Sequence, residues 1–518
     1  MTAGSGGGLT ISVDPTMSGA LVGDRSLKQG TLPDQVDELF GAAELGTGAG
    51  PALVYPTPGT MFPPNIARIL FQWRAPTGSV FQLHFDTPSG KLDVYTDGAQ
   101  QTCTTAGAVG KCWESDAMSL LPYLKGSAGK SVTLTLRALE PGSQPGSGGK
   151  VSESAPYQLL IAKAPVTGAI YYWSTTAQGI RRGTLDGRDA ADFLTPPLAQ
   201  NTCVACHTVS RSGKRMSVAF PGDLLGVANV VEAIPPPISF GPPPFNPGAH
   251  VAASWATFSP DDSKLVVAGQ GVLSVVNAND ASPVGTGVLP LPNGVFGSMP
   301  DWAPDNQHLV FATVTGGEKA RHLHSSSIAW LKASGDTFSG YEVVAESKLK
   351  SCGENTEAYA NPMFSPDSKW LAFSHADCES ENDPTAKIVL ARASANAEQI
   401  ALDAANMQVG DAKLANLQNG MPTWAPALDG NIGWIAFTST RDYGLVLNAE
   451  TRAGAGVGAG AGQPMRQLWV AAVDLSKAGM LDPSYPAFRL PAQDLTENNH
   501  RPFWAIDVLP PDWMPKVK

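Results

Sequence analysis

Thr257-Phe258-Ser259-Pro260-Asp261 is the stretch that decides the fold, because its pattern returns along the C-terminal two-thirds of the chain. An aromatic residue, then Ser or Ala, then Pro and usually Asp, recurs at residues 301–305, 363–367 and 423–426. Each copy precedes a short apolar segment, such as Leu265-Val266-Val267. Proline fixes φ, and an Asp side chain can cap its own backbone, so each copy predicts a tight turn that leads into a strand.

Two degenerate copies, at residues 209–220 and 502–505, bring the number of units to six. Their spacing is near that of a four-stranded propeller blade with loop insertions. The repeat resembles the TolB-type, WD40-like β-propeller repeat, and this resemblance implies a six-bladed propeller over residues 166–518. In such propellers the inner strands line a channel and the chain ends share a blade. We therefore expect residues 168–173 and 179–182 to complete the blade that ends near Trp504. A β-sandwich with incidental repeats is the alternative.

Residues 9–165 predict a separate unit ahead of the propeller. Five segments alternate or run apolar at strand length, with turn residues between them: 67–73, 80–85, 91–95, 132–137 and 157–161. This spacing is typical of an immunoglobulin-like or fibronectin type III-like sandwich. Residues 1–8 are predicted to be a flexible linker. The expected fold class is therefore all-β: a sandwich followed by a propeller.

The composition agrees with many short strands and excludes some classes of partner. The chain of 518 residues has 54 Gly and 43 Pro, and only 16% of its residues are charged. A net charge of −11 disfavours nucleic-acid binding, which needs a basic face. No segment is long and apolar enough to span a membrane.

Residues 203–207 read Cys-Val-Ala-Cys-His, the form of a c-type haem attachment site. Two residues between the cysteines place both sulfurs at the vinyl positions of one porphyrin edge, and the adjacent imidazole falls under the iron. This predicts thioether bonds at Cys203 and Cys206 and proximal iron ligation by His207. A thioredoxin-like redox pair or half of a zinc site are the alternatives.

The motif also falls in phase with the repeat. His207 occupies the column that holds Pro300 and Pro362, two residues before the motif aromatic. Cys206 occupies the preceding column, with Met299 and Asn361. The haem motif is therefore predicted at the start of the inner strand of the first blade, with the haem capping one end of the channel.

The sixth iron ligand is open to several readings. His250 follows a stiff Pro-rich arm at residues 234–248 and is the first candidate, ahead of Met299, Met421 and His500. Met216 aligns with core leucines of the other units, so we interpret it as a packing residue. A thioether ligand, a second imidazole or an open position would give the iron different chemistry.

The other four cysteines predict two disulfides, Cys103–Cys112 and Cys352–Cys378, each across a short loop or hairpin. Disulfides and haem attachment both indicate an oxidising compartment, here the periplasm or the outer surface of a bacterium. Export needs a signal segment, which this chain lacks, so we expect that a leader was removed; a lipid anchor before processing is compatible with the Gly/Ser-rich start.

Asp377, Glu379, Glu381 and Asp383 are a candidate calcium loop, with an acidic solvated turn as the alternative. The function predicted from the motif is electron transfer by an exported monohaem cytochrome with a protein redox partner. A haem enzyme that acts on a small oxidant, and a TolB-like interaction scaffold with structural haem, are the alternatives.

Overall fold

The computed structural model describes most of residues 22–509. The gaps in this range are 77, 101–109, 144–148, 187–188, 198–203, 221–223, 231–252, 315–318, 349–356, 408–416, 447–464 and 492. The predicted linker 1–8, the Pro-rich arm with His250, and Cys103, Cys203 and Cys352 lie outside the described residues.

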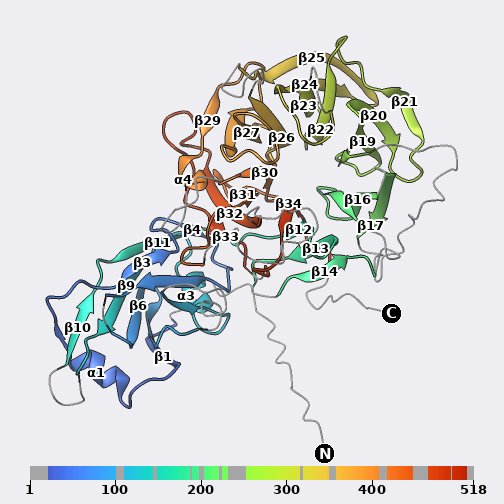
Figure 1. The fold of residues 1–518 in the computed structure, drawn as a ribbon. Coiled ribbons are helices and arrows are strands. Elements are labelled where there is room, and N and C mark those ends of the chain that lie inside the picture. Colours follow the sequence, from blue (N-terminus) through green and yellow to red (C-terminus); the bar gives the residue numbers. More distant parts are fainter. Residues whose placement is uncertain are drawn as a thin grey trace, which may run out of the picture.

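The described residues of the N-terminal unit form two sheets and two short helices (Figure 1). The larger sheet has eight strands: β1 (Arg25–Gln29), β2 (Glu44–Leu45), β4 (Met61–Phe62), β6 (Phe81–Thr87), β7 (Gly90–Thr96), β9 (Ser131–Leu139), β10 (Lys150–Glu153) and β11 (Tyr157–Ile161). The smaller sheet has three: β3 (Ala52–Tyr55), β5 (Leu70–Arg74) and β8 (Lys111–Glu114). The helices are α1 (Val36–Ala42) and α3 (Leu121–Gly126).

All five strands predicted for this unit are present, as β5, β6, β7, β9 and β11. Their alternation explains their placement: in β9, Val132, Leu134 and Leu136 are buried while the residues between them are partly exposed. Parallel pairings of β1 with β7, β10 with β2 and β11 with β4 join the antiparallel ones. The immunoglobulin-like assignment stays a prediction.

Six blades follow in the described residues, arranged around a ring in the upper part of Figure 1; they form five sheets, because two neighbouring blades are joined into one sheet of eight strands. The first contains β12 (Ala169–Ser174), β13 (Gly179–Gly183) and β14 (Ala191–Leu194), together with β34 (Asn499–Ala505). The second contains β15 (Ala205–Val209), β16 (Arg215–Phe220) and β17 (Leu224–Asn229). The third contains β18 (Trp255–Phe258), β19 (Lys264–Gly269), β20 (Val272–Asn277) and β21 (Pro283–Val288).

The next three contain β22 (Phe296–Trp302), β23 (His308–Val314), β24 (Ser326–Ser334), β25 (Thr337–Ala345); β26 (Ala358–Phe364), β27 (Trp370–Ala376), β28 (Lys387–Arg392), β29 (Gln399–Ala401); and β30 (Gly420–Trp424), β31 (Ile432–Ser439), β32 (Gln467–Asp474), β33 (Phe488–Arg489). One parallel bridge between Ser326 and Ala358 links two neighbouring blades. A helical turn, α4 (Asp403–Asn406), follows β29.

The ring closes as the repeat predicts. β34, near the C-terminal end, pairs antiparallel with β12, and β13 and β14 continue the same sheet. Ala169 pairs with Ala505 and Trp173 with His500. The segments expected to complete the blade near Trp504 therefore do so, and the propeller is fastened between its first and last strands.

The Ser/Ala-Pro-Asp pieces form the predicted turns. Asp261 Oδ1 accepts the backbone N–H of Ser263 at 3.1 Å, and Asp305 Oδ1 accepts that of Gln307 at 2.9 Å. The residue after each Asp has a left-handed φ, 61° at Asp262 and 62° at Asn306. The turn chemistry inferred from the sequence is confirmed.

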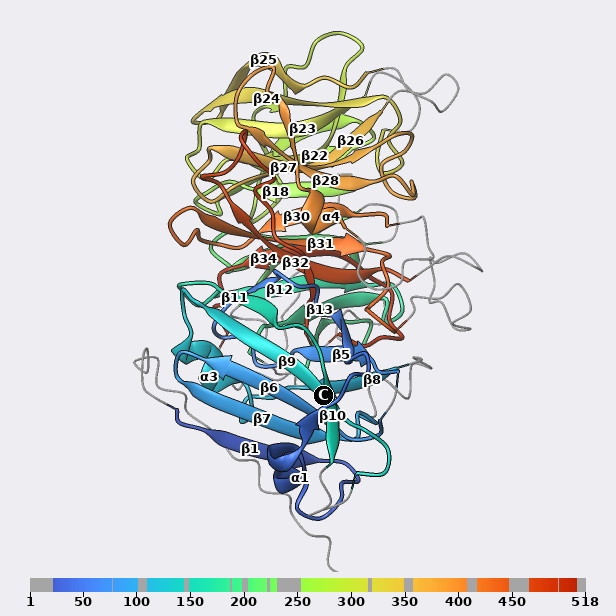
Figure 2. The same cartoon turned by 90° about the vertical axis from the view of Figure 1, so that its left-hand side faces the viewer.

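The N-terminal unit packs on the blade formed by β30–β33, as Figures 1 and 2 both show. Buried Gln72 of β5 donates to the Tyr443 carbonyl at 2.9 Å and accepts the Leu445 N–H at 2.6 Å. The Tyr55 hydroxyl accepts the backbone N–H of Arg489 at 3.0 Å. One hydrophobic core continues through this contact. Among the described residues, no helix has the length and apolar character needed to cross a membrane.

Candidate functional site

Each inner strand but one carries a bulge at the same place in the repeat. Five residues there have left-handed backbone angles: Cys206 (φ 46°), Met299 (51°), Asn361 (52°), Met421 (53°) and Arg501 (48°). The strand register shifts at each of them. In four units the next residue is proline, which has no N–H to lose from the ladder. His207 takes that place after Cys206.

The bulges surround a small cavity in the propeller channel. The cavity has a volume of about 50 Å³ and is lined by Trp255, Met299, Asn361, Met421 and Arg501, together with the residues that follow each of them. This is room for a few water molecules only. A porphyrin could therefore cap the channel but not enter it.

Cys206 lies on the inner strand β15, at the bulge, and its thiol is in no disulfide. The thiol is buried and contacts the guanidinium of Arg501, which stacks 3.8 Å above the Trp255 ring. Burial lowers the pKa of Arg501 to about 10, and the nearby sulfur and Glu381 oppose this effect. A reduced sulfur and a buried cation therefore share the channel wall.

His207 is fully enclosed in the neighbouring position. Its Nε2 lies 3.1 Å from the Tyr171 carbonyl oxygen and donates to it, which ties β15 to β12 of the closing blade. Its Nδ1 has no hydrogen-bond partner among the described residues. Burial first, and the charge of Arg501 second, lower the pKa of His207 to about 3, so the imidazole is neutral.

These residues fit a c-type haem only in part. Cys206 offers a thiol that is in no disulfide, and His207 offers a neutral imidazole, which is the form that binds a metal. The imidazole, however, has no exposed surface, and its Nε2 is engaged by Tyr171. His207 therefore does not fit iron ligation in the orientation that it has here. Cys203 lies outside the described residues.

The candidate distal ligands lie at different depths. Met299 is buried, and its sulfur accepts the Asn361 N–H at 3.4 Å. Met421 is half-buried on the cavity wall. His500 is enclosed against Trp173, with ring centroids 5.5 Å apart, and burial moves its pKa well below the ordinary value.

Met216 is completely buried in β16, in the core cluster of the first blades. Its interpretation as a packing residue is confirmed. Cys112 and Cys378 are disulfide-bonded, and their expected partners, Cys103 and Cys352, lie outside the described residues.

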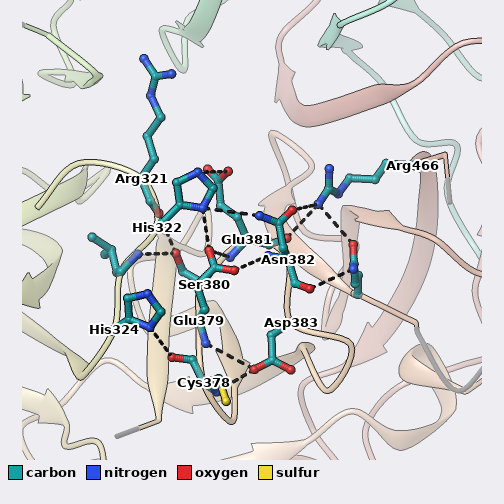
Figure 3. Close-up of polar contacts among 12 residues, drawn as sticks. Arg321, His322, His324, Cys378, Glu379, Ser380, Glu381, Asn382, Asp383 and Arg466 are labelled. Carbon is teal, nitrogen blue, oxygen red and sulfur yellow. Dashed lines mark hydrogen bonds and ion pairs between the residues drawn. The ribbon is translucent and has the colours of Figure 1, made fainter. Parts of the chain in front are cut away.

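In the loop that begins at Cys378, carboxylate side chains accept hydrogen bonds from backbone N–H groups of the same loop (Figure 3). Asp383 accepts the N–H groups of Cys378 and Glu379, and Glu379 accepts those of Glu381 and Asn382. His322 Nδ1 lies 2.8 Å from Glu379 Oε1 (Figure 3). Glu381 Oε2 lies 3.9 Å from Nε2 of the same imidazole, so two carboxylates of the loop face His322. Calcium binding by the loop stays a prediction.

Arg466 connects this loop to the inner strand at the chain's end. Its Nη2 donates to the Glu381 carbonyl and to Asn382 Oδ1, at 2.9 and 2.8 Å (Figure 3). Its Nη1 lies 3.5 Å from His500 Nε2. The acidic loop is therefore linked through Arg466 to the residue that precedes Arg501 at the channel.

One metal-compatible group was not predicted from the sequence. Glu357, His375 and Asp377 each bring one ligand atom within 4.8 Å of the others. His375 Nε2 lies 3.1 Å from Glu357 Oε1, and its Nδ1 lies 2.8 Å from Gln399 Oε1. Only the pairing of β26 with β27 brings Glu357 to His375, so no local spacing could have signalled the group.

No protein-family model and no curated protein matches the chain. Similar solved structures are β-propellers. TolB from Acinetobacter baumannii has 11% identity and a TM-score of 0.37 over 73% of this chain and 80% of its own. A putative TolB from Agrobacterium tumefaciens has 12% identity and a TM-score of 0.34 over 66% and 99%. The dihydro-heme d1 dehydrogenase NirN, in complex with DHE, has 12% identity and a TM-score of 0.32 over 62% and 54%.

Proposed function

We propose that this protein is an exported β-propeller with one haem attached covalently through Cys203 and Cys206, and that it transfers single electrons to a partner protein. The observation that carries the proposal is Cys206 itself. It is a reduced, buried thiol in a haem-type motif, in a chain whose Cys112 and Cys378 are oxidised. A bound haem supplies a one-electron centre whose potential depends on its axial ligands.

The residues around the thiol have defined roles in this proposal. Cys206 anchors the group at the channel wall, and Arg501 provides a positive charge beside it. His207 would have to leave the Tyr171 carbonyl before it could serve as proximal ligand. In this proposal the cysteines attach the haem, and the imidazole of His207 reorients when the haem is attached.

An interaction scaffold is the second candidate, and a specific observation favours it. The hydrogen bond from His207 to Tyr171 joins the first blade to the closing blade, which is a structural role that needs no metal. In this reading the motif stabilises the ring, and the surfaces of the propeller bind another protein.

The test is the visible absorption spectrum, oxidised and reduced, of the chain exported in a host that performs c-type haem maturation. The double variant Cys203→Ala/Cys206→Ala is compared with His308→Ala, which removes a histidine stacked on Trp330 in another blade. We expect haem that survives denaturing electrophoresis in the control and is lost in the double variant. A folded, exported protein without haem would refute the proposal and favour the scaffold.

A second arm addresses the imidazole. If His207 binds iron, His207→Ala keeps the covalent haem but changes the spectrum from that of a six-coordinate to that of a less saturated iron. Rapid carbon monoxide binding by the unaltered protein would instead indicate an open site, as the haem-enzyme alternative requires. An identical spectrum in His207→Ala would show that the iron takes its ligands from elsewhere.

A further inference from the structure

A second cavity, far larger than the channel, lies where the N-terminal unit meets the blade β30–β33. Its volume is about 340 Å³. Ligand pockets span roughly 300–1,000 Å³ and often lie between domains. Part of its wall is apolar and comes from both units, with Phe62, Ile69 and Leu70 on one side and Phe488 on the other.

Arg489 brings a charge to this cavity. Its side chain is only 7% exposed. Nε and Nη2 donate to Gln467 Oε1 at 3.1 and 2.6 Å, and Nη2 also donates to the Gln493 carbonyl at 2.8 Å. Arg489 lines the cavity, and among the described residues its Nη1 has no hydrogen-bond partner and no carboxylate lies within ion-pair distance. A buried cation without a counter-ion is costly, so an anion here would stabilise it.

Tyr443 supplies a second donor at the same place. Its ring lies 4.9 Å from the guanidinium carbon of Arg489. Tyr443 also lines the cavity, and its hydroxyl makes no hydrogen bond to a described residue. Burial raises the pKa of Tyr443, which keeps the hydroxyl neutral and able to donate.

Two other charged side chains of the wall, Arg68 and Asp494, already have ion-pair or hydrogen-bond partners. Arg68 donates to Asp189 at 2.7 Å and to Glu114 at 3.4 Å. Asp494, at the exposed rim, accepts the N–H and the hydroxyl of Thr496, both at 2.7 Å. Among the described residues, the guanidinium of Arg489 makes no ion pair, and the carboxylates of Glu114 and Asp494 act on its charge only from beyond ion-pair distance.

The geometry points to a binding site for a small monocarboxylate with an apolar body, its carboxylate on Arg489 and Tyr443 and its body against the apolar wall. A guanidinium edge and a neutral hydroxyl are donors that suit a carboxylate. The apolar wall rewards burial of hydrocarbon. This site is independent of the haem motif and of the proposed electron transfer.

The experiment measures binding of 3-phenylpropanoate to the full chain by isothermal titration calorimetry, with 3-phenylpropanamide as the uncharged ligand of the same shape. Three variants are compared: Tyr443→Phe, which keeps the ring and removes only the hydroxyl; Arg489→Lys, which keeps the charge but not the fork; and Tyr485→Phe, a matched change at a tyrosine whose hydroxyl contacts Lys477 instead.

We expect saturable binding of the acid. The amide should bind more weakly than the acid by roughly tenfold or more, because its complex lacks a charge-assisted hydrogen bond. Tyr443→Phe should lower the affinity for the acid by about three- to tenfold, and Arg489→Lys should lower it by at least as much. Tyr485→Phe should match the unaltered protein. Absence of saturable binding, equal binding of acid and amide, or binding unchanged in Tyr443→Phe would overturn the inference. The ligand comparison holds even if Arg489→Lys fails to fold.

Discussion

The sequence motif and the packing of His207 indicate two different roles. Its place after Cys206 is that of an iron ligand, while its packing is that of a core histidine bonded to the Tyr171 carbonyl. The sequence identifies the motif but says nothing about which way the imidazole turns. That orientation depends on β12, which approaches only because the ring closes.

The enclosure of His207 has a measurable consequence for acid stability. The folded pKa of about 3 lies below the ordinary 6.5, so on acidification the unfolded chain takes up the proton first. This group's stabilising contribution is present above pH 6.5 and is lost as the pH falls toward 3. The slope from one such group is about 1.4 kcal/mol per pH unit.

We therefore expect His207→Gln to flatten the pH dependence of the free energy of unfolding between pH 6.5 and 4, measured by denaturant titration of the haem-free protein. The Gln amide can still donate to Tyr171 but does not titrate in this range. Parallel profiles for the two proteins would contradict an enclosed, neutral imidazole.

At the scale of the element, the repeated turn is the feature that the sequence predicts most fully. Asp261, Asp305 and Asp367 each accept the backbone N–H two residues later, as their Pro-Asp context predicts. The bulges on the inner strands were not predicted, although their columns were aligned correctly. A left-handed φ is not a local preference of Met299, whereas Asn361 tolerates it, and the proline that follows in four units is compatible with a bulge.

The left-handed position in the turn predicts an asymmetry between two substitutions. Asn306 is exposed, has φ 62° and precedes β23. Asn306→Val should destabilise the protein by about 1–2 kcal/mol, because a β-branched residue is strained at positive φ. Asn306→Gly should be nearly neutral. Melting temperatures of the two variants check this, and equal temperatures would exclude a strained turn.

At the scale of the molecule, the mostly β class followed from the repeated turn-and-strand pattern. The propeller ring and its closing blade were what the resemblance of this pattern to the TolB-type repeat implied. The N-terminal strands followed from alternation. The contact between the two units did not, since Gln72 and Tyr443 carry no pattern that relates them. The interdomain cavity is for the same reason invisible in the sequence.

That contact predicts cooperative unfolding of the two units. Gln72→Ala removes both hydrogen bonds to the 443–445 turn. It leaves the buried Leu445 N–H unpaired, which should cost about 2 kcal/mol, whereas the Tyr443 carbonyl still accepts the Val446 N–H at 3.0 Å. Calorimetry should then show two transitions where the unaltered protein shows one. Gln158→Ala, whose side chain bonds only Thr133 within the N-terminal sheet, should leave a single transition. Two transitions in the unaltered protein would contradict the prediction.

The pairing of β12 with β34 also sets an order in time. Synthesis proceeds from the N-terminus, so β12 must wait for the last strand of the chain before its blade can form. During that interval the open edge of β12 is available for incorrect pairing. Cys206 and His207 emerge soon after β12, while Tyr171 has not yet been locked into the ring. The growing chain therefore exposes two side chains that the finished ring encloses.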